Sequence, residues 1–172
     1  MPDAQRVPVL LDTSVLINFL AINRIDLLAR HPGFRFTITE HVRAEVSTHY
    51  SEQLARLLAA LAEGGLEEAR VESIEELALF ARFTENPRLG LGECAATAAA
   101  ITRGSILAID DKAARKAALE YSPRLGLIDT QAIVLSLIRA GELTVQEADS
   151  IKEIWAQQHN FRLRIDSFAV LL

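Results

Sequence analysis

The chain has 172 residues, of which 50% are hydrophobic and 24% charged, and this balance argues against a disordered protein because it can fill the core of one domain. The single cysteine, Cys94, excludes an internal disulfide. The net charge of −5 does not decide for or against a nucleic-acid substrate, since a local basic rim matters more than the total charge.

Short apolar runs alternate with helical periodicity along the chain. The run at 7–11 predicts a buried parallel strand, and further strands are expected at 34–38, 66–71, 106–109 and 125–128, with 66–71 at an edge. Helices are expected at 13–21, 26–30, 40–50, 51–63, 73–83, 92–103, 111–120, 130–140 and 144–159. This alternation predicts an α/β protein with a parallel sheet covered by helices.

Export and membrane signals are not visible in the sequence. The stretch from Met1 to Arg6 lacks the apolar run of a signal peptide. No later stretch approaches the roughly 18 apolar residues that a membrane helix needs. We therefore expect a cytoplasmic protein that does not contact a membrane.

Carboxylates follow the predicted strands, at the edge where parallel sheets bind ligands. They are Asp12, Glu45, Glu93, Asp110, Asp111 and Asp129, with Glu45 and Glu93 on neighbouring helices. Crowded carboxylates repel one another unless they are protonated or bridged by cations, and their hard oxygens suit Mg²⁺ or Mn²⁺. Such a site can activate water for an in-line displacement at a phosphodiester.

A structural interpretation of the same residues stays open. Asp12 and Asp111 suit helix N-caps, and Glu93 suits the first turn of its helix. For any one residue alone this interpretation is the stronger one, so the functional prediction depends on the whole set.

A row of His41, Glu45 and His49 lies on one face of the predicted helix 40–50. No HExxH pattern or cysteine pair accompanies the row, so a zinc site is not expected. We expect a solvated helix face instead.

Four segments occur in the order and at the spacing typical of a known family. They are Leu11-Asp12-Thr13-Ser14-Val15-Leu16-Ile17, Val42-Arg43-Ala44-Glu45-Val46, Leu89-Gly90-Leu91-Gly92-Glu93-Cys94-Ala95 and Ile109-Asp110-Asp111-Lys112-Ala113-Ala114-Arg115. Together they resemble the PIN-domain family and, within it, the VapC-like ribonucleases of the branch that carries an Asp-Asp-x-x-Ala-Arg segment. The resemblance covers about residues 7–140.

The resemblance implies a three-layer α/β/α sandwich with a central parallel sheet. We expect one PIN-like domain over residues 1–172, with a core at about 7–140 and a helical extension at 141–172. The implied activity is endonucleolytic cleavage of single-stranded RNA with Mg²⁺ or Mn²⁺. An alternative is a catalytically idle PIN-like module that binds RNA or protein, although such modules usually lose acidic ligands and all principal positions are filled here.

The resemblance also assigns roles to residues. The expected catalytic carboxylates are Asp12, Glu45, Glu93 and Asp111. The expected metal ligands are Asp12, Glu93, Asp111 or its neighbour Asp110, and Asp129. Ser14 is expected to hold water or phosphate. Four basic residues near this edge are candidates for binding phosphate, although each also suits a solvated surface: Arg43, Arg88, Lys112 and Arg115.

Two protein partners follow from the resemblance. One is an antitoxin that plugs the acidic cleft of a toxin and keeps it silent. The other is a second copy of the chain, and an apolar helix face around Leu16 or Val134 is the expected homodimer contact.

Overall fold

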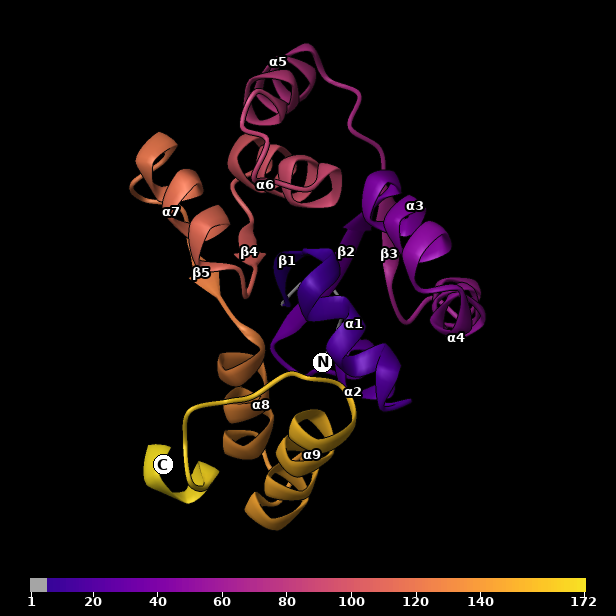
Figure 1. Cartoon of the computed structure of the whole chain (residues 1–172), viewed down its shortest axis with the longest axis vertical. Helices are drawn as coiled ribbons and strands as arrows, with labels where there is room; N and C mark the ends of the chain where they lie inside the picture. The colour runs from indigo at the N-terminus through magenta and orange to yellow at the C-terminus, as the bar shows by residue number, and fades with distance from the viewer. Residues whose placement is uncertain (1–5) are drawn as a thin grey trace.

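A parallel sheet forms the centre of the protein (Figure 1). The structure is a computed structural model that describes residues 6–172, so the expectation of no signal peptide falls mainly outside the described residues. The strands run in the order β3-β2-β1-β4-β5, and every pairing is parallel. They are β1 (Val7–Leu11), β2 (Phe34–Thr39), β3 (Glu67–Ala69), β4 (Ile106–Ala108) and β5 (Leu127–Ile128). Each predicted strand is confirmed, with β3 at an edge.

Helices cover both faces of this sheet. They are α1 (Thr13–Ala21), α2 (Asp26–Ala29), α3 (Glu40–His49), α4 (Ser51–Ala62), α5 (Ile74–Thr84), α6 (Leu91–Arg103), α7 (Lys112–Tyr121), α8 (Thr130–Arg139), α9 (Val145–Gln158) and a 3₁₀ turn, η2 (Phe168–Leu171). Leu10 packs on α6 and α7, whereas Val9 and Leu11 face the cluster formed with α1, α2, α4, α8 and α9. Successive strand residues thus serve opposite layers, and the three-layer α/β/α sandwich is confirmed.

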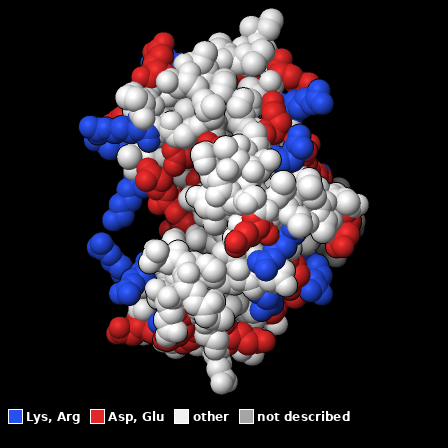
Figure 2. Space-filling view, turned by 45° about the vertical axis from the view of Figure 1, so that its right-hand side comes forward, with Lys and Arg blue, Asp and Glu red and all other residues white. Residues whose placement is uncertain are grey.

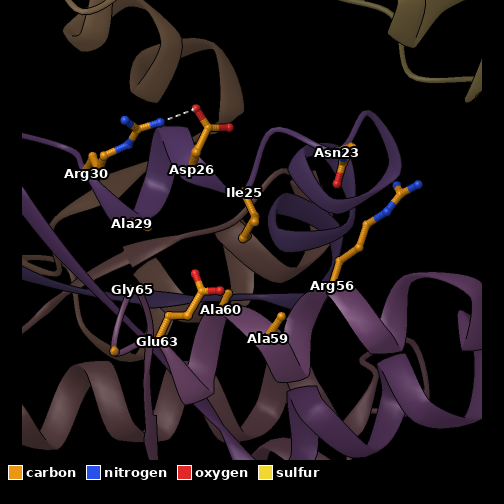
Figure 3. Close-up of a pocket in the computed structure, with 11 residues that line it drawn as sticks. Asn23, Ile25, Asp26, Ala29, Arg30, Arg56, Ala59, Ala60, Glu63 and Gly65 are labelled. Atoms are coloured by element: carbon orange, nitrogen blue, oxygen red, sulfur yellow. Dashed lines mark hydrogen bonds and ion pairs between the residues drawn. The ribbon is translucent and has the colours of Figure 1, made fainter.

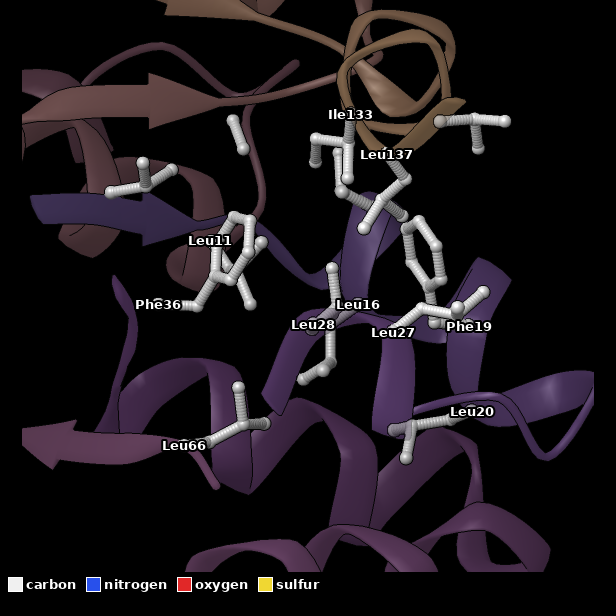
Figure 4. Packing of buried hydrophobic residues seen from close by; sticks show 14 of the residues in the cluster. Leu11, Leu16, Phe19, Leu20, Leu27, Leu28, Phe36, Leu66, Ile133 and Leu137 are labelled. Carbon is white, nitrogen blue, oxygen red and sulfur yellow. The ribbon is translucent and has the colours of Figure 1, made fainter. Parts of the chain in front are cut away.

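The larger core lies between the sheet and the helices around α1. Figure 4 shows Leu11 and Phe36 of the sheet in this cluster, together with Leu16 of α1. Leu16 and Val134 are both completely buried inside the protein. The expected homodimer contact around these two residues is therefore wrong, because neither side chain reaches the surface.

Helix α6 is enclosed by its neighbours because its side chains are small. Cys94 and the alanines of this helix are completely buried. An ion pair between Arg103 Nε and Glu76 Oε1, 2.5 Å apart, ties its end to α5. The hydrogen bond from Arg103 lowers the pKa of Glu76 to about 2. Helix α6, which carries Glu93 in its first turn, is therefore fixed to α5 at its C-terminal end.

The C-terminal segment packs against the same core. Trp155 of α9 is completely buried and meets Phe19 of α1 edge to face, with ring centroids 5.7 Å apart. Phe168 of η2 is also completely buried, and Asp149 accepts hydrogen bonds from Ser167 Oγ and the Phe168 N–H. Between residues 6 and 172, no helix is long and apolar enough to cross a membrane.

Candidate active site

The carboxyl ends of β1 and β4 lie side by side where the chain changes direction across the sheet. β2 and β3 lie on one side of β1, and β4 and β5 lie on the other. Leu11 pairs with Ala108, and the Asp12 N–H donates to the Ala108 carbonyl at 3.0 Å. Open parallel sheets bind ligands at such a switch point.

Asp12 lies at the bottom of this site and is completely buried. Its Oδ2 accepts hydrogen bonds from the Ser14 N–H at 3.2 Å and from Ser14 Oγ at 2.5 Å. Its Oδ1 is buried and has no hydrogen-bond partner among the described residues. Burial raises the pKa of Asp12 to about 7, and the charge of Glu93 adds to this effect against the hydrogen bonds from Ser14. A buried oxygen without a partner is suited to a cation or a proton.

Glu45 reaches the site from α3 and is held by two donors. Its Oε2 accepts from Thr13 Oγ1 at 2.5 Å, and its Oε1 accepts from the Gly92 N–H at 2.7 Å. A Cβ atom at Gly92 would lie 2.5 Å from Glu45 Oε2 and 2.6 Å from Thr13 Oγ1. Only glycine at position 92 therefore leaves room for this carboxylate.

Glu93 begins α6 and turns back onto the preceding loop, where its Oε2 accepts from the Gly90 N–H at 2.9 Å. Burial raises its pKa against this hydrogen bond, and the charges of Asp111 and Glu45 raise it further. The charge of Glu93 also raises the pKa of Asp12. Asp12, Glu45, Glu93 and Asp111 therefore form one electrostatic group, which we call the acidic group.

Asp110 belongs to a different set of contacts. Its Oδ2 accepts from Asn18 Nδ2 at 3.0 Å and from Thr130 Oγ1 at 2.6 Å, and its Oδ1 accepts from the Thr130 N–H at 2.9 Å. Burial raises its pKa against the Thr130 bonds, and Asp129 adds to the rise. Since Asp110 already has three donors, the geometry favours Asp111 in the acidic group. Ligation by Asp110 or Asp129 stays a prediction.

Three of the predicted aspartates cap helices. Asp12 caps α1, Asp111 caps α7 through the Ala114 N–H at 2.8 Å, and Asp129 caps α8 through the Ala132 N–H at 2.8 Å. The structural interpretation of Asp12 and Asp111 is thus confirmed. It does not exclude a second role, because a carboxylate has two oxygens and a cap occupies only part of their capacity.

A cleft of about 380 Å³ opens over Asp12, Glu45 and Glu93, whereas Asp111 is not among the residues that line it. Its lining residues are Asp12, Thr13, Ser14, Glu45, His49, Tyr50, Arg88, Gly90 and Glu93. Tyr50 was not among the predicted site residues, because no motif marks it. His49 was expected on the same helix face as Glu45, as part of a solvated surface, and it lines the cleft. Figure 2 shows one side of the molecule on which acidic side chains gather in a hollow near the left edge, with basic side chains projecting above and below it.

Some of the basic residues predicted to bind phosphate already have partners in the described part of the protein, and others do not. Arg43 forms an ion pair with Glu68 at 2.7 Å, and Arg115 donates to the carbonyls of Ile109 and Ile128. Lys112, the first residue of α7, is exposed. Arg88 lines the cleft and forms no ion pair within residues 6–172.

A wider groove of about 590 Å³ lies between α2 and α4, near the amino end of β3 (Figure 3). Arg30 forms an ion pair with Asp26 at 3.1 Å, and Arg56 donates to the Leu20 carbonyl at 2.5 Å. Asp26, Arg30 and Arg56 are thus engaged with protein groups, and the groove is remote from the switch point. We therefore place the candidate active site in the smaller acidic cleft.

The acidic cleft fits a hard divalent cation by its donor chemistry. Every candidate ligand is a carboxylate oxygen, and Asp12 Oδ1 is buried without a partner. No group of three His, Cys, Asp or Glu side chains in the described part is already arranged around a common metal position. Glu93 faces Gly90, and Glu45 is held by Gly92. Asp12 is therefore the residue best placed to receive a cation, and Glu93 Oε1, which Gly90 does not engage, remains a second donor.

The chain is therefore an α/β protein with a parallel sheet and a carboxylate site at its switch point that suits a divalent cation. The family model described as PIN domain matches residues 8–171, so the chain belongs to the PIN-domain family. PIN domains are generally nucleases, which supports a hydrolase, and they generally use divalent metal ions. The match includes the segment after residue 140, beyond the region in which the sequence motifs lie.

Two solved structures are similar to this chain at low sequence identity. PAE2754 from Pyrobaculum aerophilum is 18% identical with a TM-score of 0.50, covering 80% of this chain and 91% of its own. VapBC2 from Rickettsia felis, bound to a DNA fragment from its promoter, is 17% identical with a TM-score of 0.47, covering 72% and 98%. A search of the curated proteins finds no match.

Proposed function

We propose that the protein is a metal-dependent endoribonuclease that cleaves single-stranded RNA by attack of water on phosphodiester bonds. The observation that carries the proposal is the unpaired, buried Oδ1 of Asp12 within the acidic group. Mg²⁺ or Mn²⁺ is the cation that its oxygens fit. All principal acidic positions of the four segments are filled, which also favours activity over an idle PIN-like module.

We propose separate roles for the carboxylates and for Ser14. Asp12 and Glu93 are the proposed ligands together with Asp111, while Asp110 and Asp129 are further candidates. A bound divalent cation offsets the carboxylate charges and stabilises negative charge on the phosphate. Ser14 fixes Asp12 through Oδ2, and Oδ1 stays without a hydrogen-bond partner among the described residues.

Two carboxylates are suited to orient the attacking water or to accept its proton. Glu45 is held in one orientation by Thr13 and Gly92. Burial raises the pKa of Glu93 above its ordinary value, and a more basic carboxylate is better suited to accept a proton from water. Lys112 is the exposed cation next to Asp111 and is proposed to bind the RNA backbone.

A toxin role is the finer part of this proposal. It is supported by the resemblance of the four sequence segments to VapC-like ribonucleases, and it implies an antitoxin protein that blocks the cleft. Induced expression in a bacterial host should then arrest growth, and the Asp12→Asn variant should not. Normal growth with active enzyme in the cell would leave a ribonuclease that is not a toxin.

The deciding experiment is cleavage of labelled single-stranded RNA with Mn²⁺ or Mg²⁺. We expect cutting by the wild type, none in EDTA, and a loss of at least about 100-fold in Asp12→Asn. Glu75→Gln, an exposed carboxylate on α5, is the matched control and should cut like the wild type. Folded protein that neither cuts varied RNAs nor binds metal would favour the idle module.

A further inference from the structure

Tyr50 holds a fixed place between two helices. It is the single residue between the end of α3 and the start of α4. Its N–H donates to the Val46 carbonyl, and its carbonyl accepts from the Gln53 N–H, both at 2.9 Å. The backbone of Tyr50 is therefore anchored in both helices, so the ring is carried by a rigid frame.

The ring of Tyr50 lines the acidic cleft and remains available to a ligand. The residue is 38% exposed, and its side chain makes no hydrogen bond or ring contact with the described part of the chain. Tyr121 is exposed to a similar degree, 43%, but it packs against Phe83 and lies under the guanidinium of Arg82. Tyr50 thus presents an aromatic surface that no neighbour uses.

Arg88 supplies the matching charge on the same cleft. It is exposed, and within residues 6–172 its guanidinium has no carboxylate partner despite the acidic group nearby. An exposed guanidinium without a carboxylate partner can bind a phosphate with two parallel hydrogen bonds. The acidic group repels phosphates, so a cation on the cleft wall also offsets part of that repulsion.

We propose that Tyr50 and Arg88 hold one nucleotide of single-stranded RNA beside the carboxylates, with its base stacked on the Tyr50 ring and a phosphate on Arg88. The inference rests on the proposed nuclease function and names the residues that position its substrate. Bases in a duplex are already covered by their neighbours, whereas an unstacked base can lie on an aromatic side chain. The cleft therefore selects single strands through Tyr50.

The test measures binding apart from cleavage. In the Asp12→Asn background with Mg²⁺, a short fluorescent single-stranded RNA is titrated and its anisotropy is recorded. Tyr50→Ala should weaken binding about 5- to 100-fold, as expected for the loss of one stacked base. Tyr50→Phe should bind like its parent, and Tyr50→Leu, which keeps apolar bulk without an aromatic face, should lose as much as Tyr50→Ala.

A second probe separates stacking from a structural effect. An RNA of the same length with abasic sites should bind Tyr50→Ala and its parent equally, and a 2-aminopurine base should be quenched by the parent and by Tyr50→Phe only. Arg88→Ala should weaken both probes, because it acts on phosphate. Tyr121→Ala and Arg162→Ala, exposed residues outside the cleft, are the matched controls.

The outcomes distinguish this inference from the proposed function. Equal binding of the base-bearing RNA by Tyr50→Ala and its parent, or equal loss on the abasic probe, overturns the role of Tyr50 even if the wild type still cleaves RNA. A parent that binds no single strand overturns the inference together with the RNA substrate, and the cleavage assay then shows whether any nuclease activity remains.

Discussion

Trp155 donates a hydrogen bond from Nε1 to the backbone carbonyl of Asn18 at 2.7 Å, and the side chain of Asn18 donates to Asp110 at 3.0 Å. The C-terminal helix α9 is thus linked to the strand-end carboxylates through one residue of α1. Asn18 is almost fully buried, so its amide has little access to water as an alternative partner. The link makes the position of Asp110 dependent on the C-terminal segment.

Replacing Asn18 with aspartate should destabilise the protein by about 2–3 kcal/mol at neutral pH, because the new carboxylate would face Asp110 without a donor between them. Trp155→Phe, which keeps an aromatic ring and loses the Nε1 donor, should cost about 1 kcal/mol. Urea unfolding at pH 7.5 and pH 5 measures both. The loss in Asn18→Asp should shrink at pH 5 as one carboxyl takes up a proton, and a loss that is the same at both pH values would contradict this explanation.

Asp111 offers a way to separate its cap from its proposed role in the acidic group. Asparagine caps helices as well as aspartate does, so Asp111→Asn should change the free energy of unfolding by only a few tenths of a kcal/mol, whereas Asp111→Ala should cost about 1 kcal/mol. Both variants remove the carboxylate, and both should lose at least about 10-fold in metal-dependent cleavage. If Asp111→Asn cleaves like the wild type, Asp111 acts only as a cap. The same pair of substitutions at Asp110 tests the alternative ligand.

Gly92→Ala should reduce cleavage while preserving the fold. The added methyl group would meet the carboxylate of Glu45, which can move aside, and also Thr13 Oγ1, so we expect a modest loss of stability in a protein that still folds. The displaced carboxylate should lower the rate at least about 10-fold, since a misplacement of about 1 Å can cost roughly 100-fold. Gly33→Ala is the matched control, because its nearest neighbour lies 3.8 Å away and its φ is not positive. Full activity in Gly92→Ala would show that Glu45 is dispensable in its present orientation.

The raised pKa of Asp12 predicts a pH-dependent stability in metal-free buffer. Its pKa is about 7 in the folded protein and about 3.8 unfolded, so the folded state binds more protons between these values. The stability that Asp12 contributes is therefore complete below about pH 4 and is lost as pH rises through 7. We expect the difference in unfolding free energy between wild type and Asp12→Asn to fall from pH 5 to pH 8 in EDTA. Titrating groups that do not interact with Asp12, such as His31, are present in both proteins and cancel in this difference, whereas the coupling with Glu93 is part of the measured effect.

Saturating Mn²⁺ should reverse the trend at high pH, because a cation binds the ionised form of Asp12 and not the protonated one. Thermal unfolding in EDTA and in Mn²⁺ at pH 8 checks this expectation. An equal rise in melting temperature in wild type and Asp12→Asn would place the metal elsewhere.

The sequence predicts the sheet and its strand-end carboxylates well because both depend on local patterns. The apolar run before Asp12 is short and continuous, as a central parallel strand requires. The neighbour relation of β1 and β4 then brings Asp12 and Asp111 to one edge, as the strand order implies.

Contacts between distant segments were harder to predict. Arg43 is close to Glu45 in the sequence and was therefore expected near the carboxylates. In the fold, β3 brings Glu68 beside it, and the two side chains form an ion pair. The choice between Asp110 and Asp111 depends on Thr130 and Asn18, which no spacing connects to them. The sequence already placed a helix junction at residue 50, but nothing in it shows that this junction lines the cleft.

The acidic group also has a consequence for the synthesis of the protein. Its members stand at positions 12, 45, 93 and 111, and the Asn18 contact adds Trp155 near the end of the chain. A ribosome must therefore release most of the polypeptide before these carboxylates can meet. A growing chain, or a fragment that ends before Asp111, therefore has no complete acidic group.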